Sequence, residues 1–350
     1  MTFLLFLILF ALLTIPHEFG HFIFAKMFGV KVYEYAIGFG PKIFGYKGKE
    51  TSFALRLIPI GGFVKMAGVD DLNTEDLNIE PEEKIPEDRK FYNKPAWQRF
   101  FILFAGSLMN FVIAILLFVS IFLIGIPEPV PIVDKVLSDK PASVAGFLPG
   151  DKILYINGVK IEKTSDAVEI ITNSIKSPQD KKTITVIVQR GEEEVALQVT
   201  PEWSEDRKGG VIGVSFKTIP KKYSLIDSIR NGISEFFNTL LLIFLLIKAL
   251  FSGAQGVVVS GPVGIAKMTG EVASLGMVYF LNFAALFSAQ LGIFNLLPIP
   301  ALDGGRILFI IIEKIRGKRI ETRKEETVHW IGLLVLLFFM LIITIFDILR

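Results

Sequence analysis

Cysteine is absent from the 350 residues, and histidine occurs only three times. The lack of cysteine excludes a disulfide framework and a thiol nucleophile, and it is compatible with any compartment. The first apolar stretch lacks the basic start and the small-residue cleavage site of a secretory signal peptide. It also carries His17 and Glu18 where a signal peptide has an apolar core. We therefore expect a retained helix.

Long hydrophobic runs are abundant. Hydrophobic residues make up 51% of the chain, and its mean hydropathy is +0.54. Four runs reach or approach the roughly 20 residues that a membrane-spanning helix needs: residues 2–24, 100–126, 277–299 and 330–346. The sequence thus predicts an α-helical multi-pass membrane protein with four transmembrane helices.

Lysine and arginine crowd two loops, residues 28–99 and 307–329. The positive-inside rule places both loops in the cytoplasm, and four spans put them on the same side. A further apolar stretch, residues 236–251, is long enough to span, but a crossing there would send the second basic loop to the opposite side. Parity therefore favours a helical region at the membrane surface over residues 221–270, although the sequence leaves a crossing open.

Two segments have β-strand patterns. Residues 35–68, rich in glycine and β-branched residues, predict a cytoplasmic-side β-hairpin region associated with the membrane. A phosphate-binding loop is disfavoured, because no helix opens after these glycines. Residues 129–217 predict an extracytoplasmic β-rich domain, in which Asn157-Gly158 forms a hairpin turn and residues 183–189 form a strand. Its Gly150-Asp151 and Asn157-Gly158 elements resemble a PDZ domain, and a structural β domain is the alternative.

The expected parts of the chain are a first transmembrane helix (1–27), a cytoplasmic loop (28–99) with its hairpin (35–68), a second transmembrane helix (100–126), the PDZ-like domain (129–217), the membrane-surface helical region (221–270), a third transmembrane helix that ends in Leu-Asp-Gly-Gly (277–306), the basic cytoplasmic loop (307–329) and a fourth transmembrane helix (330–348).

The strongest chemical signal is His17-Glu18-Phe19-Gly20-His21. On a helix, two histidines at positions i and i+4 project from one face and can bind a single Zn²⁺. Glu18 points elsewhere and is free to act as a general base. Chance or packing is the alternative, but ionisable residues within a spanning helix cost about 2.5 to 3.5 kcal/mol each on insertion scales and are functional by default.

Two histidines leave a catalytic zinc ion one protein ligand short. Asp303 is the better candidate for the third, because the predicted topology places it with His17 and His21 in the cytoplasmic half of the membrane. The alternative for Asp303 is a turn residue before two glycines. His329, the remaining histidine, is expected to be an interfacial residue at the start of the fourth helix.

These residues resemble the paired signature of the site-2 protease family of intramembrane metalloproteases, and the single PDZ-like domain resembles the regulator-of-sigma-E protease type. Only one such domain fits, whereas the Gram-negative type carries two. The similar segments are His17–His21, Ile37–Pro41, Ile58–Met66, Ala105-Gly106 with Asn110-Phe111, Gly261–Gly264, and Asn295 with Pro298, Leu302, Asp303 and Gly304.

The resemblance implies that His17, His21 and Asp303 bind Zn²⁺ and that Glu18 is the catalytic base. It also implies a substrate-binding edge strand, since a helical substrate must be unwound before its carbonyls can be attacked. The implied substrate-binding residues are Gly61, Gly62, Phe63, Val64 and Asn295. For Asn295, a helix-to-helix hydrogen bond is the alternative.

The implied location is the bacterial inner membrane, with the active site toward the cytoplasmic half. The implied substrates are single-pass membrane proteins, such as anti-sigma factors, and remnant signal peptides. A peptide ligand of the PDZ-like domain and the lipid bilayer are further expected partners, and nucleic acid is not one. We hypothesise that the PDZ-like domain limits access to the site, and recruitment of substrate is the alternative.

Two other functions are compatible with intramembrane histidine and carboxylate side chains. The first is an ion or proton pathway, but the sequence has no inverted repeat and no second cluster of intramembrane charges. The second is a PDZ-bearing membrane scaffold with a structural zinc ion or none. Such a scaffold would not need Glu18 beside the metal.

Overall fold

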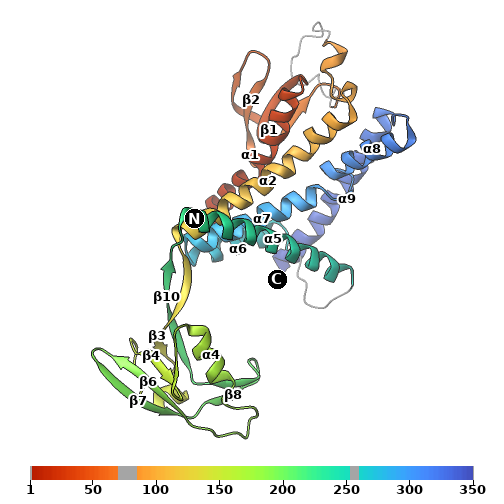
Figure 1. Ribbon diagram of the computed structural model, residues 1–350. Helices are drawn as coiled ribbons and strands as arrows, with labels where there is room; N and C mark the ends of the chain where they lie inside the picture. The colour runs from red at the N-terminus through yellow and green to blue at the C-terminus, as the bar shows by residue number, and fades with distance from the viewer. Residues whose placement is uncertain (1, 70–84, 253–259, 350) are drawn as a thin grey trace. The chain divides into compact units, whose positions relative to one another are not determined.

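The computed structural model describes residues 2–69, 85–252 and 260–349 (Figure 1). The chain divides into two compact units, residues 1–123 with 224–350, and residues 124–223. The first unit contains α1 (Thr2–Met27), β1 (Val32–Lys47), β2 (Ser52–Met66), short 3₁₀ turns η3 (Glu87–Arg89) and η4 (Phe91–Asn93), α2 (Ala96–Ile124), α5 (Leu225–Phe251), α6 (Pro262–Ser274), α7 (Met277–Asn295), α8 (Asp303–Arg316) and α9 (Thr322–Leu349).

Five helices in the described residues are long and apolar enough to cross a membrane: α1, α2, residues 225–249 of α5, α7 and α9. The sequence predicts four of these as spans and leaves the α5 region open. The range 277–306, expected to carry the third transmembrane helix, holds α7, a loop and the first turn of α8. The additional candidate is α5, whose apolar second half follows a mixed polar and apolar first half.

Close helix packing in the first unit depends on glycine. A Cβ atom added at Gly20 of α1 would lie 2.3 Å from the carbonyl oxygen of Ala105 on α2. The missing side chain therefore lets the two helices approach at backbone distance. In its first half, α1 packs through Leu9 and Leu13 against Phe280 and Phe283 of α7.

Strands β1 and β2 form an antiparallel hairpin with repeated register shifts. The first part of β1 has ladder partners in residues 52–55 and also in residues 62–66. The last part of β1 pairs only with residues 52–56. This folding back requires Gly38, whose φ is +84° and where a Cβ would lie 2.4 Å from the Ile58 oxygen. Residues 62–66 consequently have ladder partners, within the described chain, in β1 alone.

The turn of this hairpin is held against α1 by charge. Glu50 pairs with Lys26 in the last turn of α1 and with Arg89 at 2.7 Å. Hydrogen bonds from these two cations lower the pKa of the Glu50 carboxyl to about 2. The hairpin is thus fixed beside the helix that carries the two histidines.

The second unit is a β-rich domain. Its elements are β3 (Ile126–Val136), α3 (Pro141–Val144), β4 (Lys152–Ile156), β5 (Val159–Lys160), α4 (Thr164–Thr172), β6 (Ile184–Arg190), β7 (Glu193–Val199), β8 (Glu202–Ser204), β9 (Gly209–Val211) and β10 (Val214–Lys221). The main sheet has the order β10-β3-β4-β6-β7. The predicted Asn157-Gly158 turn and the strand near residues 183–189 are confirmed, because both turn residues have positive φ and β6 occupies that range.

One ion pair between a buried carboxylate and a part-exposed arginine ties this sheet together. Asp151 is 1% exposed, and its carboxylate accepts two 2.8 Å hydrogen bonds from Arg190 and one from the Leu148 backbone N–H. Burial alone would raise the pKa of Asp151. The hydrogen bonds from Arg190 and Leu148 outweigh burial and hold the pKa below its usual range.

Candidate metal centre

His17 and His21 lie one turn apart on α1 and are 8% and 6% exposed. Their Nε2 atoms are 3.2 Å apart. The Nδ1 atom of His21 lies 2.8 Å from the carbonyl oxygen of Ile102, so Nδ1 carries the proton and donates to it. This contact leaves the Nε2 lone pair of His21 available as a metal ligand.

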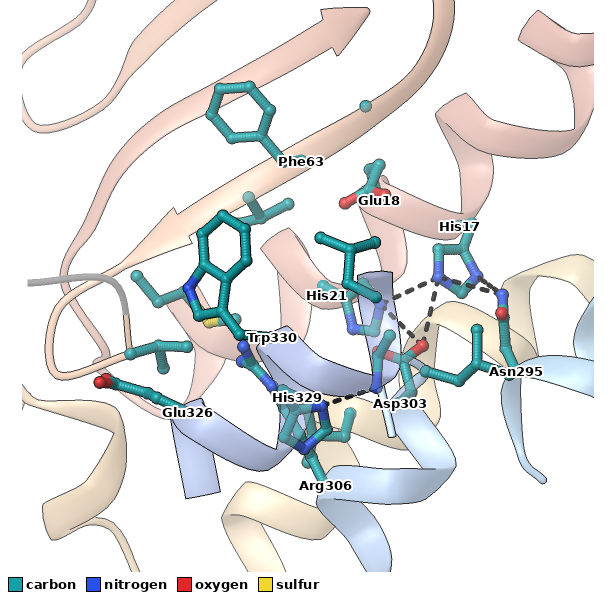
Figure 2. Close-up of a pocket in the computed structure, with 18 residues that line it drawn as sticks. His17, Glu18, His21, Phe63, Asn295, Asp303, Arg306, Glu326, His329 and Trp330 are labelled. Atoms are coloured by element: carbon teal, nitrogen blue, oxygen red, sulfur yellow. Dashed lines mark hydrogen bonds and ion pairs between the residues drawn. The ribbon is translucent and has the colours of Figure 1, made fainter. Parts of the chain in front are cut away.

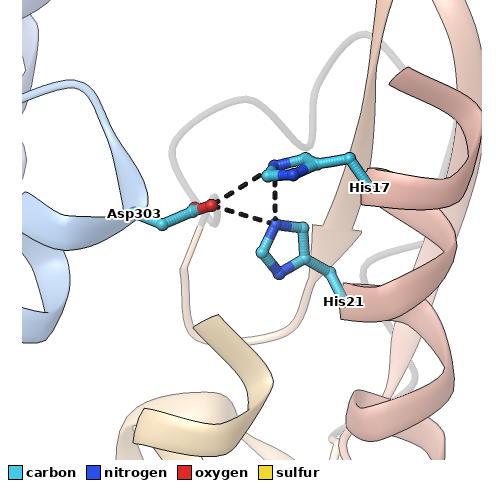
Figure 3. A group of neighbouring side chains, drawn as sticks. All are labelled: His17, His21 and Asp303. Atoms are coloured by element: carbon cyan, nitrogen blue, oxygen red, sulfur yellow. Dashed lines mark hydrogen bonds and ion pairs between the residues drawn. The ribbon is translucent and has the colours of Figure 1, made fainter. Parts of the chain in front are cut away.

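Asp303 reaches the same point from the N-terminus of α8 (Figure 3). Its Oδ2 atom lies 3.2 Å from Nε2 of His17 and 3.3 Å from Nε2 of His21. This oxygen is buried and accepts no hydrogen bond within the described part of the chain. A buried carboxylate oxygen of this kind calls for a positive partner.

The three ligand atoms fit a zinc ion. Zinc binds imidazole nitrogen and carboxylate oxygen at about 2.0 to 2.2 Å in tetrahedral geometry, which separates any two ligands by about 3.3 to 3.6 Å. The three measured separations, 3.2, 3.2 and 3.3 Å, are close to that edge length. Two nitrogens and one oxygen also leave a fourth position, as in catalytic zinc sites.

The loop between α7 and α8 brings Asp303 into place. A Cβ added at Gly304 would lie 2.2 Å from the carbonyl oxygen of Leu297, and one at Gly305 would lie 2.4 Å from that of Ile299. The two glycines after Asp303 therefore allow the start of α8 to press against the preceding loop. Asp303 is the first residue of a helix, which differs from the turn residue considered as its alternative.

The second helix supports the two imidazoles. Gly106 faces them so closely that a Cβ there would lie 2.4 Å from Nε2 of His21 and 2.6 Å from Cε1 of His17. Asn110, one turn further on, has its Nδ2 atom 3.3 Å from Nδ1 of His17. A flip of the Asn110 side chain exchanges its amide nitrogen and oxygen. With the oxygen turned toward the ring, Asn110 accepts the Nδ1 proton of His17 and leaves Nε2 of His17 free.

Glu18 is half-buried and lines the same pocket as the two histidines (Figure 2). The backbone of β2 lies against it, since a Cβ at Gly62 would be 3.0 Å from Cγ of Glu18 and 2.8 Å from the Ala36 oxygen. Gly62 therefore leaves the space that the Glu18 side chain needs.

The pocket has a volume of about 460 Å³. Of the predicted substrate-binding residues, Gly62, Phe63, Val64 and Asn295 line it. Gly61 does not, because it faces the ring of Phe39. The Nδ2 atom of Asn295 lies 3.5 Å from both ring nitrogens of His17.

Several lining residues were not predicted from the sequence. Arg306, Glu326, His329 and Trp330 complete the pocket wall (Figure 2). His329, expected to be interfacial, is 9% exposed and accepts a hydrogen bond from the backbone N–H of Ala301. Its interfacial position stays a prediction, but the contact of the loop before Asp303 with the start of α9 was not foreseen, because no sequence periodicity reveals it.

The geometry above can hold a metal ion among helices that are long and apolar enough to cross a membrane. The profile of peptidase family M50 matches residues 5–339, and the chain belongs to this family, the site-2 proteases. The regulator of sigma-W protease RasP from Bacillus subtilis is 34% identical, over 100% of this chain and 98% of its own length. The zinc metalloprotease RasP from Bacillus licheniformis is 33% identical, over 100% and 99%. The protein is therefore a zinc metalloprotease of the intramembrane type that acts in regulated intramembrane proteolysis.

Among solved structures, the crystal structure of the PDZ domain of the SdrC-like protein (Lmo2051) from Listeria monocytogenes matches 26% of this chain and 90% of its own. The TM-score is 0.22 and the identity 16%. This likeness is too slight to assign a fold, so the PDZ assignment of residues 129–217 stays a prediction.

Proposed function

We propose that His17, His21 and Asp303 hold the zinc ion and that Glu18 is the general base for hydrolysis of peptide bonds within or near transmembrane segments. The observation that carries this proposal is the triangle of two imidazole nitrogens and one buried carboxylate oxygen, with sides of 3.2 to 3.3 Å. A bound zinc ion supplies Lewis acidity, which polarises a carbonyl oxygen and makes water a nucleophile at neutral pH.

The residues of the chain then divide the remaining work. Glu18 takes a proton from the attacking water and passes it to the leaving amine nitrogen. Ile102 and Asn110 keep the two imidazoles oriented through their Nδ1 atoms. Asn295, at the pocket edge beside His17, is placed to bind a backbone carbonyl of an unwound substrate.

Residues 62–64 of β2 offer an edge to that substrate. They line the pocket, and their ladder partners in the described chain belong to β1 only. An extended peptide added at this edge regains the backbone hydrogen bonds it loses when its helix unwinds. We infer that substrates bind as strands, and that they are single-pass membrane proteins, such as anti-sigma factors, or remnant signal peptides.

Four membrane crossings fit the packing better than five. The two basic loops meet, because Arg99 pairs with Glu313 at 2.7 Å and Arg319 donates to Asn93 at 3.2 Å. At the other end, Gly264 of α6 donates its N–H to Asp347, near the end of α9, at 2.8 Å.

Helix α6 therefore lies at the outer end of the bundle, and ten residues, 252–261, separate it from α5. A return crossing needs about 20 residues. We infer that α5 enters the membrane without crossing it, that residues 129–217 lie outside, and that the metal site faces the cytoplasmic half of a bacterial inner membrane.

The topology can be tested with single cysteines, because the chain has none of its own. We expect a cysteine at Asn157 to react with a labelling reagent applied outside, and one at Lys318 to react with the reagent applied on the cytoplasmic side. Labelling of both from the same side contradicts this topology.

The test of the proposed function is cleavage of a membrane-spanning test substrate by reconstituted wild type and Glu18→Gln. The variant keeps size and hydrogen bonding but removes the base, so we expect zinc content to be retained. Cleavage should fall by about 10² to 10⁴-fold. Equal cleavage by both proteins would refute Glu18 as the base. Absence of cleavage by a zinc-loaded wild type would instead count against the proposed class of substrate.

A further inference from the structure

The loop before Asp303 contains a turn with an unfavourable residue at one position. The N–H of Leu302 donates to the carbonyl oxygen of Ile299 at 3.2 Å, which closes a β-turn over Pro300 and Ala301. Ala301 has a φ of +80°. A turn with proline first and a positive φ second is of type II, where the second position favours glycine because a Cβ is strained there.

His329 of α9 contacts this turn. The N–H of Ala301 donates to Nδ1 of His329 at 2.9 Å, in a part-buried contact at the edge of the pocket in which His329 is buried and Ala301 half-buried. A type II turn leaves this particular N–H outside its own hydrogen bond. Without His329, the described structure gives it no other acceptor, and a part-buried donor that loses its partner is unfavourable.

A second contact holds the same turn to α9. A Cβ added at Gly332 would lie 2.4 Å from Cβ of Pro300 and 2.8 Å from its carbonyl oxygen. His329 and Gly332 are three residues apart, so they share one face of α9. The turn is thus seated on that face, two residues before the carboxylate that completes the metal site.

We propose that His329 is a positioning residue. Its Nδ1 atom stabilises the strained Ala301 conformation and thereby presents Asp303 to His17 and His21. This inference rests on the proposed role of Asp303 as a zinc ligand. His329 itself does not bind the ion: Nδ1 accepts from Ala301, so Nε2 carries the ring proton, and the group of ligand atoms that can share one ion in the described residues consists of His17, His21 and Asp303.

Three substitutions test this proposal: two separate the acceptor atom of His329 from its ring, and the third removes the backbone strain at Ala301. His329→Asn places an amide oxygen where Nδ1 lies and keeps the acceptor. His329→Phe keeps a ring, including the contact with Phe309 at 5.8 Å, but removes the acceptor. Ala301→Gly removes the strain that the hydrogen bond offsets, because glycine adopts positive φ readily.

The measurement is the Zn²⁺ dissociation constant of the full-length protein in detergent, determined by competition with a chelating dye. We expect His329→Phe to bind Zn²⁺ roughly tenfold more weakly, since fewer molecules hold Asp303 in the binding position. His329→Asn should stay within about threefold of wild type, as should the double variant His329→Phe/Ala301→Gly. Peptide cleavage at limiting Zn²⁺ should follow the same order.

Wild-type affinity in His329→Phe would overturn the proposal. The proposal would also be overturned if His329→Asn bound Zn²⁺ as weakly as His329→Phe, because the ring rather than the hydrogen-bond acceptor would then matter. A double variant no better than His329→Phe would overturn it as well. If His329→Phe does not fold alone, His329→Asn and His329→Phe/Ala301→Gly decide: both should bind Zn²⁺ within about threefold of wild type, and clearly weaker binding by either would overturn the proposal. Asp303→Asn is the control for the underlying function, since unchanged Zn²⁺ affinity there would refute the ligand assignment and not the turn.

Discussion

Replacing Gly106 by alanine should destroy the metal site without touching a ligand. The added Cβ would lie 2.4 Å from Nε2 of His21 and 2.6 Å from Cε1 of both His21 and His17, whereas ordinary contact begins at 3.4 Å. At least one ring must therefore move by about 1 Å. Metal-ligand distances tolerate only about 0.2 Å, so both imidazoles cannot remain in place around one ion.

The fold should survive this change. Gly106 lies inside α2, where alanine is favoured over glycine by about 1 kcal/mol, and the clashing atoms are the ends of side chains that can rotate. Loss of an outer partner of a zinc ligand typically lowers metal affinity 10- to 100-fold. Since this methyl group strikes the ligands themselves, we expect at least about a hundredfold loss.

The assay is zinc per molecule after purification, combined with thermal unfolding and substrate cleavage. Gly270→Ala is a matched control. Its Cβ would lie 2.6 Å from Cγ2 of Thr2, at the far end of α1, about 22 Å along the helix from His17 at 1.5 Å per residue. The control should keep its zinc. A folded Gly106→Ala protein with full zinc and wild-type activity would refute the arrangement described for His17 and His21.

Three further predictions concern other parts of the molecule. Gly62→Ala should retain zinc but lower cleavage at least about tenfold by displacing Glu18, and unchanged turnover would show that β2 does not lie against the base. Asp151→Asn should destabilise the β-rich domain by about 2 kcal/mol, measured by hydrogen exchange of its amides in the full chain. Folding lowers the pKa of Asp151, so its contribution to the stability of the domain is present above the unfolded pKa of about 3.9 and is lost as the pH falls through the folded pKa. If the stability of Asp151→Asn depended on pH as that of the wild type does, the role of the ion pair would be contradicted. Deletion of Pro131–Phe216 with a short linker should preserve cleavage of a short-tailed substrate and increase cleavage of an untrimmed one, whereas loss of both in a protein that still binds zinc would mean recruitment rather than gating.

The sequence predicts those parts of the site that depend on local spacing. His17 and His21 follow from helical periodicity, and Asp303 follows from counting helices and assigning their direction. Their roles as ligands remain predictions. The break after Asn295 was not predicted, since apolar residues continue to Ile299 and hydropathy does not record where a helix ends.

Residues that act through tertiary contact leave weaker signals. Gly106 matters because α1 and α2 cross at Gly20, and a single sequence does not state where helices cross. The sequence marks Asn110 only as part of a segment that resembles the family, and its backbone oxygen accepts a hydrogen bond from Ser288 of α7 at 2.8 Å. Its side chain beside His17 depends on the same crossing. The hydrogen bond of His329 could not be predicted, because its partner is a backbone N–H in a turn that is distant in the sequence.

The most direct test of the metal centre is the zinc K-edge X-ray absorption spectrum of the purified full-length protein. The arrangement of His17, His21 and Asp303 predicts one zinc ion surrounded only by nitrogen and oxygen at about 2.0 to 2.2 Å, with outer-shell scattering from two imidazoles. Asp303→Asn should change the first shell while both imidazoles remain. Scattering from three imidazoles would bring His329 into the coordination sphere and would contradict both the ligand set and the role assigned to His329.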